Sequence, residues 1–428
     1  MKLNLKVLLL SFVASLFSLS AFAVPVTQST KSCKPLIDKS KKPPKISIQG
    51  LNERTHKRLN KALELLAEDQ YAEAVERLKS LLDTVRSDYE KATVNLNLAY
   101  AYAQQGKQVE SLPFFKQALE YGKTTLPHER VQGLRINVAS MLYSAGEKKK
   151  ALNMMLEWAD NAVKDDDTAY YMIAAFYSED GNYDKALCPA YYAVKSAPTP
   201  KKDYYQALLA FHWEKKDVKG AGDLLKEMVA LFPAEKDYWR QLSQVYFQLD
   251  KIEDALAIME MFYLNGGFNK ETDYTWLSAL FSYNEVPYRA AKVLEEGLNK
   301  KLVKSEKKIW QAIANNYHIS NEISKAIVAF GKTGELSDTG ESYLKQAELL
   351  TDEERWGDAV AAYDKALQKG KLDDPGRAHF RKGVALISMG RCDSGMSVLE
   401  TASKYKKYRQ RASQWTDFAK DRIRNEKC

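Results

Sequence analysis

Apolar side chains recur at three- and four-residue steps along most of the chain, and short polar joints separate the apolar stripes. The stretch 237–267 shows this pattern: Trp239 and Leu242 belong to a first stripe, and Ala255 and Met259 belong to a second. This spacing places the apolar side chains on one face of a helix. The stretch therefore predicts two antiparallel helices joined by a short turn. Such a hairpin has apolar surface on more than one side, so it needs similar neighbours to bury it.

The helical hairpin recurs ten times, and one position in every copy holds a small residue. Aligned on Ala255, these residues are Ala74, Ser111, Ala151, Ala186, Ala221, Ala255, Ala290, Ala326, Ala359 and Gly395. Subtracting successive residue numbers gives spacings of 37, 40, 35, 35, 34, 35, 36, 33 and 36. A small side chain lets two helices approach closely, whereas a larger one would overpack their crossing. We call these ten positions the small column.

Other positions keep the same period. A large side chain stands nine residues before the small column in every copy, for example Tyr177 and Tyr246. Sixteen residues before it, the later copies carry Tyr170, Tyr205, Trp239, Tyr274, Trp310, Tyr343 and His379. The joints hold Gly106, Gly146, Gly181 and Gly390, which predicts that a left-handed residue ends the first helix there.

This arrangement resembles the tetratricopeptide repeat family, whose pattern recurs over 34 residues. The fourth copy carries the pattern most fully, with Tyr170, Ile173, Ala174, Tyr177, Gly181, Tyr183, Ala186, Ala190, Ala193 and Pro198. The resemblance implies an all-α fold, a right-handed α-solenoid of about ten helical hairpins followed by a C-terminal capping helix. The expected array spans 55–405, with repeats at 55–88, 92–125, 132–165, 167–200, 202–235, 236–269, 271–304, 307–339, 340–373 and 376–405.

Three parts of the array are expected to depart from this regularity. The first copy matches the pattern least, so an irregular first helix is expected there. The longer spacings around the second and third copies imply extended loops near Thr124–Arg130. The segment 406–428 has an apolar stripe among basic residues, which predicts the capping helix that a repeat array needs. A basic partner-binding surface is the alternative interpretation of that segment.

The first 23 residues predict a secretory signal peptide. Two lysines precede an apolar run at Val7–Leu19, and Ala21-Phe22-Ala23 forms a small-x-small cleavage site. The alternative is an uncleaved membrane anchor, but the run is shorter than the ~20 residues that span a bilayer. We expect a soluble periplasmic protein without a membrane span after signal cleavage.

Residues 24–54 form a basic segment rich in proline and lysine. Pro35, Pro43 and Pro44 forbid a helix here. The segment is interpreted either as a solvated linker or as a basic arm that folds onto a partner. The formal net charge of +8 over 428 residues is weak evidence for an anionic partner. Because the basic positions lack the interleaved aromatic residues of a single-strand binder, no nucleic-acid partner is expected.

The four cysteines predict disulfides, since an even number is expected in an exported protein. Cys392 begins the second helix of the last hairpin, and Cys428 would return near that start if the capping helix runs antiparallel. A Cys392–Cys428 bridge is therefore favoured. It leaves Cys33 and Cys188, whose bridge would pin the basic N-terminal segment to the fourth copy.

The sequence holds little evidence of catalytic chemistry. The five histidines, His56, His128, His212, His318 and His379, are scattered and have no metal-ligand spacing with cysteine or aspartate. His212 and His379 occupy packing columns. Asp165-Asp166-Asp167 suggests a cation site, but it precedes a helix, where the dipole favours acids. No phosphate-binding glycine loop or Gly-x-Ser-x-Gly occurs. We expect no catalytic residues, no metal and no cofactor.

What remains is surface, and the family resemblance implies where to look. In tetratricopeptide repeats the first helices line a concave groove, with groove residues one, five, eight and nine positions after the first aromatic column. Carried onto this sequence, these include Tyr100, Tyr143, Tyr171, Gln206, Trp213, Arg240, Gln244, Phe247, Tyr283, Gln311, Asn315 and His318. Rigid rings and amides suit an extended polypeptide. The alternative is that these rings partly pack against neighbouring hairpins. The carboxylate clamp of chaperone-type members is not matched.

Two functions are compatible with this pattern. The first is a non-catalytic periplasmic scaffold that binds another protein. The layout resembles the tetratricopeptide-repeat proteins that accompany TonB–ExbB–ExbD systems, which would imply contact with TonB or its partners during outer-membrane transport. The second is a cell-envelope assembly factor that binds peptidoglycan or a glycan-processing enzyme, with the basic segment on anionic wall polymer. An enzyme within the array is a third interpretation.

Overall fold

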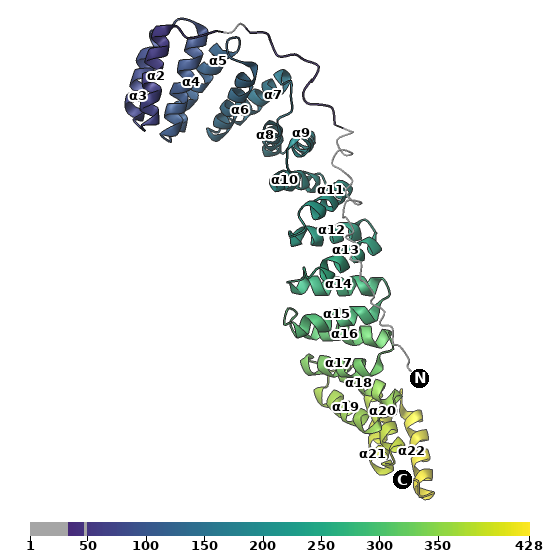
Figure 1. Cartoon of the computed structure of the whole chain (residues 1–428). Coiled ribbons are helices and arrows are strands. Elements are labelled where there is room, and N and C mark those ends of the chain that lie inside the picture. The colour runs from purple at the N-terminus through teal and green to yellow at the C-terminus, as the bar shows by residue number, and fades with distance from the viewer. Residues whose placement is uncertain (1–32, 47–48) are drawn as a thin grey trace, which may run out of the picture. The chain divides into compact units, whose positions relative to one another are not determined.

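The computed structural model describes residues 33–46 and 49–428. Over this part of the chain the secondary structure consists of 21 helices, α2–α22, without strands (Figure 1). The expected all-α fold of helical hairpins is thereby confirmed. The predicted signal peptide, residues 1–23, and residues 24–32 lie outside the described residues.

The chain divides into two compact units, of which unit 1 ends at Tyr238 and unit 2 begins at Trp239. In unit 1, each first helix is followed by an antiparallel partner. Its helices are α2 (Glu53–Ala67), α3 (Tyr71–Leu82), α4 (Asp88–Gln104), α5 (Gln108–Gly122), α6 (His128–Ser144), α7 (Lys148–Asn161), α8 (Asp167–Glu179), α9 (Tyr183–Ser196), α10 (Lys202–Glu214) and α11 (Val218–Leu231).

Unit 2 continues the same alternation and ends in a single helix. Its helices are α12 (Lys236–Gln248), which crosses the boundary, α13 (Ile252–Leu264), α14 (Glu271–Tyr283), α15 (Pro287–Asn299), α16 (Lys307–Ile319), α17 (Ile323–Leu336), α18 (Glu341–Asp352), α19 (Trp356–Lys369), α20 (Pro375–Ser388), α21 (Cys392–Ser403) and α22 (Arg409–Arg424). Even-numbered helices up to α20 are the first helices of hairpins, and odd-numbered helices are the second.

One turn geometry joins the two helices of every hairpin. Five residues before the small column stands a residue with positive φ: Asp69, Gly106, Gly146, Gly181, Lys216, Asp250, Glu285, Asn321, Glu354 or Gly390. The next amide donates to the carbonyl of the large residue nine before the small column, as Lys251 does to Tyr246 at 2.8 Å. This left-handed cap satisfies a carbonyl at the end of the first helix. Four of the ten turns use glycine, and the others accept strain in a polar residue.

The small column is buried in every hairpin, where the two helices cross. Ala255 and Ala290 have no exposed surface. Ser243 and Ser278 on the first helices donate hydrogen bonds of 2.9 Å to the carbonyls of Ala255 and Ala290, respectively. At Gly395 the helices approach closely, because an added Cβ would lie 2.5 Å from the side chain of Ile387.

Two sequence expectations about the early repeats are wrong. The first helix is regular: α2 has 15 residues, and the Asn52 side chain caps it by accepting from the Thr55 amide at 2.8 Å. The extra residues around Thr124–Arg130 do not form an extended loop. The second and third repeats instead have long first helices, α4 and α6, of 17 residues each, and α6 already begins at His128. Helical backbone satisfies its own polar groups, whereas a long loop would leave them to solvent.

Residues 33–46, here called the strap, are anchored to unit 1. A disulfide joins Cys33 to Cys188 on α9, with the two Cα atoms 5.5 Å apart. Ile37 is 3% exposed. The Tyr192 hydroxyl donates to the Cys33 carbonyl at 3.3 Å. These contacts correct the interpretation of this part as a solvated linker.

Two lysines of the strap complete the anchoring. The Lys39 ammonium lies 2.5 Å from the Asp165 carboxylate, before α8. The Lys41 ammonium donates to the Asp160 carbonyl at 2.6 Å, near the end of α7. The strap therefore joins elements of two successive hairpins.

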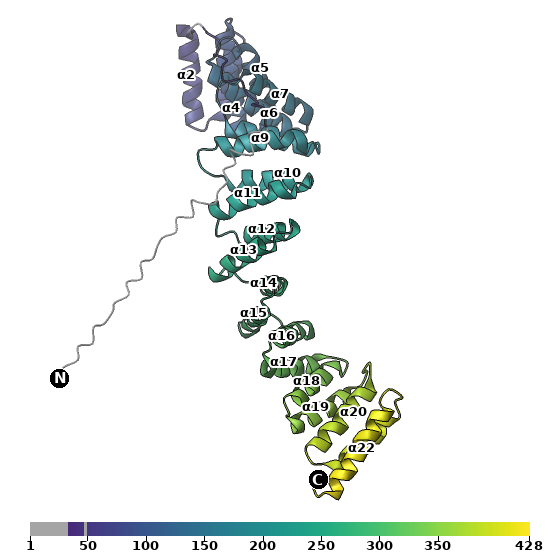
Figure 2. The same ribbon diagram turned by 90° about the vertical axis from the view of Figure 1, so that its right-hand side faces the viewer.

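The C-terminal helix α22 closes the apolar surface of the last hairpin. It lies against α21 and also contacts α20, and Figure 2 shows α22 beside α20. Ala412 and Ala419 are buried in this contact, and the Tyr408 ring stacks on Phe380. A second disulfide joins Cys392 to Cys428, the pair that the sequence favours. None of the helices in residues 33–46 and 49–428 is long and apolar enough to cross a membrane.

Candidate protein-docking face

The groove positions of three successive first helices in unit 2 are mostly uncharged. We call them the first-helix face: Arg240, Gln244, Phe247 and Gln248 on α12, Thr275, Ala279, Ser282 and Tyr283 on α14, and Gln311, Asn315, His318 and Ile319 on α16. Arg240 is the one residue among them with a permanent charge. The chain as a whole has 28% charged residues, so the face carries fewer charges than the chain average.

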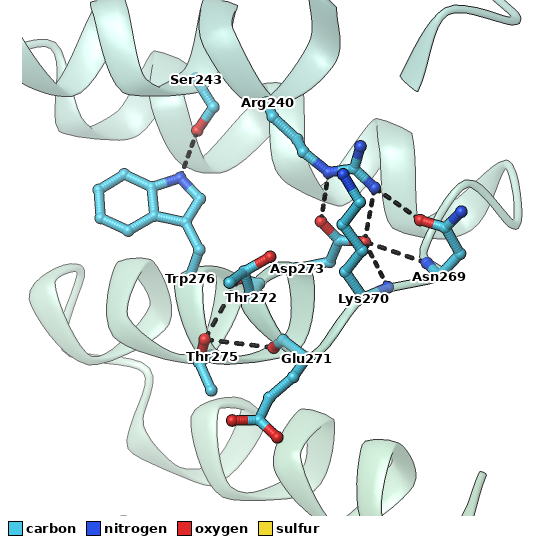
Figure 3. A network of polar contacts seen from close by, with 9 residues as sticks. All are labelled: Arg240, Ser243, Asn269, Lys270, Glu271, Thr272, Asp273, Thr275 and Trp276. Carbon is cyan, nitrogen blue, oxygen red and sulfur yellow. Dashed lines mark hydrogen bonds and ion pairs between the residues drawn. The ribbon is translucent and has the colours of Figure 1, made fainter. Parts of the chain in front are cut away.

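Arg240 is held by an ion pair between two first helices. Its guanidinium contacts the Asp273 carboxylate at 2.6 and 2.9 Å and the Asn269 side chain at 2.7 Å (Figure 3). Asp273 is 1% exposed and also accepts from the backbone amides of Asn269 and Lys270. Burial raises the pKa of Asp273, but these hydrogen bonds outweigh burial and lower it overall. Arg240 therefore neutralises a buried carboxylate within the fold.

An aromatic cluster lies beside this ion pair. The Phe247 ring packs edge-on against Trp276 at 5.0 Å and against Tyr283 at 5.4 Å. The indole nitrogen of Trp276 donates to the Ser243 hydroxyl at 2.9 Å (Figure 3). Ser243 in turn donates to Ala255, so the indole is fixed to the crossing of the hairpin. We call Phe247, Trp276 and Tyr283 the aromatic cluster.

The aromatic cluster presents apolar surface to solvent in a fixed orientation. Tyr283 is 61% exposed, and Phe247 and Trp276 are half-buried. Gln244, one turn before Phe247, is exposed. Rings held by packing lose little conformational entropy when a partner covers them, and a neighbouring amide can pair with a polypeptide backbone. The cluster can therefore bind an apolar side chain of an extended segment.

The other predicted residues of unit 2 lie on α16. Gln311 donates to Asn315 at 2.9 Å, and Ser342 on α18 donates to Gln311 at 3.4 Å. Asn315 and His318 are exposed. The side-chain amides of Gln311 and Asn315 already make hydrogen bonds within the protein. They would offer only their remaining donors and acceptors to another protein.

In unit 1, two of the five predicted residues stack on rings of the next hairpin. Tyr143 stacks on Phe176 at 4.8 Å, and Tyr171 stacks on Tyr204 at 4.4 Å. Each of these pairs joins residues 33 apart, by subtraction of their numbers, on successive first helices. These two rings therefore pack against neighbouring hairpins, which is the alternative interpretation of the predicted groove residues.

The other three predicted residues of unit 1 are each at least partly exposed. Gln206 is exposed and donates to the Tyr238 hydroxyl at 2.9 Å. Tyr100 is 41% exposed and packs edge-on against Phe115 of its own hairpin. Trp213 is half-buried. These residues lie on separate helices, α4 and α10, without the ring-to-ring contacts that define the aromatic cluster of unit 2.

Comparisons with known proteins agree with the repeat pattern. The family model described as tetratricopeptide repeat matches residues 59–124 and 344–402. The chain carries tetratricopeptide repeats in these two segments. This repeat fold supports protein–protein interactions. No curated protein matches the sequence.

Solved structures of other tetratricopeptide-repeat proteins resemble the chain at low identity. A tetratricopeptide repeat protein from Parabacteroides merdae has a TM-score of 0.36 and 15% identity, and the match covers 62% of this chain and 99% of that one. YrrB, described as having an unusual peptide-binding site, has a TM-score of 0.34 and 16% identity, with coverage of 44% and 90%. The Cut9–Hcn1 complex gives 0.30 and 10%, with coverage of 86% and 96%. We draw no functional conclusion from these similarities.

Sequence reasoning missed the residues that fix the first-helix face. Asp273, Trp276 and Ser243 are absent from the predicted set, although each contacts a predicted residue or orients the cluster. The sequence does contain a signal for these contacts. Arg240 and Asp273 are 33 residues apart, and so are Ser243 and Trp276. This separation is nearly the length of one repeat. Complementary side chains at that separation can meet across stacked first helices.

The histidine and aspartate candidates for chemistry have structural partners in this repeat fold. His212 is buried, with Nε2 2.7 Å from the Tyr191 hydroxyl and Nδ1 2.9 Å from Asp217. Asp166 caps α8 by accepting from the Ala169 amide at 2.9 Å. Within the described residues, no group of three or more His, Cys, Asp and Glu side chains could hold a metal ion.

Proposed function

We propose that this tetratricopeptide-repeat protein is a non-catalytic scaffold and that its first-helix face in unit 2 captures an extended segment of another protein. The observation that carries the proposal is the aromatic cluster, in which Tyr283 is 61% exposed beside the half-buried Phe247 and Trp276. Its rings would receive an apolar side chain, and exposed amides such as Gln244 would pair with the backbone of the segment.

The nearly neutral chemistry of the face supports a polypeptide partner over an anionic polymer. Arg240 is paired with Asp273, so the face offers no unpaired guanidinium to a phosphate or carboxylate. Binding that rests on apolar contact and neutral hydrogen bonds changes little with salt, whereas binding to wall polymer weakens steeply. Lys39 and Lys41 of the basic segment are engaged by unit 1, which further disfavours a free basic arm.

An oxidising compartment outside the cytoplasm is part of the proposal. The two disulfides support it, because such bonds persist in secreted and periplasmic proteins. The predicted signal peptide and the periplasmic location remain predictions from the sequence. The comparisons give no support for a TonB-type partner, so the proposal is limited to a protein partner.

Photo-cross-linking in native cells tests the proposal. A photoreactive residue replaces Gln244, and cross-linked proteins are identified by mass spectrometry. We expect one dominant protein partner, retained in high salt, and a loss of most cross-linking when Tyr283→Ala is added. Tyr288→Ala, which removes a 41% exposed ring from the second helix α15, is the matched control. An undiminished yield with Tyr283→Ala would contradict the proposal, provided helicity and melting are unchanged.

A further inference from the structure

The strap shows how an extended segment binds this repeat fold. A cavity of about 790 Å³ lies beside it between the third and fourth repeats, lined by strap residues 35–41 and by Ala159, Asp160, Asp165, Tyr170, Tyr192 and Lys195. Ile37 lines this cavity and is almost fully buried. Lys39 and Lys41, two and four residues later, bind Asp165 and the Asp160 carbonyl. The pattern is an aliphatic anchor followed by two charged anchors.

A second groove in unit 2 uses the same repeat positions. It encloses about 600 Å³ between the seventh and eighth repeats, lined by Glu295, Leu298, Asn299, Lys301, Val303, Lys304, Ser305 and Trp310. Leu298 and Asn299 follow the small residue of their repeat by eight and nine positions, as Ala159 and Asp160 do. Ser305 and Trp310 precede the next small residue by 21 and 16 positions, as Asp165 and Tyr170 do.

One hydrogen bond recurs in both grooves. In the strap groove, the Tyr170 hydroxyl donates to Asp165 at 2.8 Å. In the unit 2 groove, the Trp310 indole nitrogen donates to the Ser305 hydroxyl at 2.8 Å. In each case a ring of the first helix is fixed to the loop before that helix. The wall that receives the strap in unit 1 therefore has a built counterpart in unit 2.

The charge of the unit 2 groove is opposite to that of the strap groove. Neutral Ser305 and Asn299 replace Asp165 and Asp160. Lys301 and Lys304 stand exposed at the rim, and within residues 33–46 and 49–428 no ion pair joins either ammonium group to a carboxylate. The acid of this groove, Glu295, is paired with Lys292 at 3.1 Å.

The floor of the unit 2 groove is apolar. Val303 is buried, and Leu298 and the Trp310 ring are half-buried. We propose that this groove binds an extended segment of a partner protein, with an aliphatic side chain on this floor and carboxylates two and four residues later at Lys301 and Lys304. The groove is lined by the end of α15, the loop that follows and Trp310 on α16, and none of these residues belongs to the first-helix face.

The strap itself supplies matched probes for this groove. The acidic probe is a capped peptide of residues 33–42 with Cys33→Ser, Lys39→Glu, Lys41→Glu and Lys42→Glu, and a photoreactive group in place of Leu36. It has four acids and one lysine, whereas the basic probe, with Cys33→Ser and the same photoreactive group, has four lysines and one aspartate. Both probes keep Ile37. The oxidised full chain is used, so the protein's own strap stays in place.

We expect the acidic probe to bind more tightly than the basic probe and to cross-link within residues 295–310. The double variant Lys301→Glu with Lys304→Glu should weaken binding of the acidic probe about tenfold, since it replaces attraction by repulsion. The matched control is Lys345→Glu with Lys371→Glu, which makes the same charge change at exposed sites outside the groove. Raising the salt concentration should weaken binding of the acidic probe.

Three outcomes would overturn the proposal. They are equal binding of the two probes, cross-links that fall only outside residues 295–310, and an unchanged affinity in the Lys301→Glu, Lys304→Glu variant. Absence of any cross-link by the acidic probe counts against the proposal in the same way. None of these results depends on the aromatic cluster of the first-helix face.

Discussion

At the scale of single residues, the small column sets how closely the two helices of each hairpin pack. Ala255 lies at the crossing of α12 and α13, and its carbonyl accepts from Ser243 on the facing helix. There is no space for added methylene groups at such a position without displacing backbone. The size of the side chain at this one position therefore limits how closely the two helices of a hairpin can approach.

Ala255→Leu should destabilise unit 2 by roughly 1–3 kcal/mol through overpacking. Chemical denaturation followed by circular dichroism measures the effect. Ala257→Leu is the matched control, because Ala257 is exposed on the same helix and tolerates the larger side chain. Equal stability of the two variants would show that the column has room that the structure does not predict.

His212 makes the stability of unit 1 depend on pH. Burial lowers the pKa of His212 below its ordinary 6.5, although Asp217 opposes this effect. The partners suit a neutral ring that donates from Nδ1 to Asp217 and accepts from Tyr191 at Nε2. The unfolded chain takes up a proton near pH 6.5 that the folded protein does not. The stability that His212 contributes above this pH is therefore lost as the pH falls.

We expect wild-type unit 1 to lose up to about 1.4 kcal/mol per pH unit below 6.5 through this group. His212→Leu should remove that part of the pH dependence while lowering stability at neutral pH. Hydrogen exchange of α10 and α11 at pH 7 and pH 5 is the measurement. An identical pH response in the variant would exclude His212 as the source.

At the scale of elements, the strap is a non-helical segment with a defined place in the fold. Its anchors are the disulfide to Cys188, the buried Ile37 and the bonds of Lys39 and Lys41. The ion pair of Lys39 is weak by itself, since an exposed ion pair contributes ~0–1 kcal/mol. The covalent link holds the segment near its groove, so the weaker contacts form without a large loss of chain entropy.

Cys33→Ser should therefore loosen the strap while leaving the helices intact. We expect trypsin to cleave the Lys39–Ser40 and Lys41–Lys42 bonds faster in this variant than in the oxidised wild type. Mass spectrometry of a cleavage time course is the measurement, and far-UV circular dichroism serves as the control for folding. The same slow cleavage in both proteins would mean that Ile37 and the lysines suffice to hold the strap.

At the scale of the whole molecule, stacked repeats make stability local. Each repeat packs on its sequence neighbours, so a defect should propagate to adjacent repeats and fade beyond them. We expect this local propagation of defects within each of the two units. Because stability is local, the strap and α22, each held by a disulfide, stabilise different repeats.

Ala359→Leu, at the small column of the ninth repeat, provides a test of this locality. We expect faster hydrogen exchange in α16–α21 and unchanged exchange in α2–α5. The control is Ala361→Leu, since Ala361 is exposed on the same helix. Uniformly faster exchange along the whole chain would instead indicate one cooperative unit.

The sequence alone determined the repeat architecture. Helical periodicity and the small column depend on neighbours three, four and about 35 residues away, so they are visible as regular spacing. The glycine signal identified four of the ten left-handed turns. Asp69, Lys216, Asp250, Glu285, Asn321 and Glu354 accept the same conformation because the cap requires it. Aspartate and asparagine enter the left-handed region more readily than other non-glycine residues, whereas Lys216, Glu285 and Glu354 have no such preference.

Only the tertiary structure decided what the surface residues contact. Arg240 was a candidate for partner binding, but the stacking of α12 on α14 brings it to the buried Asp273. Phe247 of α12 meets Trp276 and Tyr283 of α14 only because these two helices stack, and Ser243 holds the Trp276 indole. Spacing along one helix predicts which face a residue occupies. Which side chain of the next repeat it meets depends on how the helices stack, because that contact joins residues more than 30 positions apart.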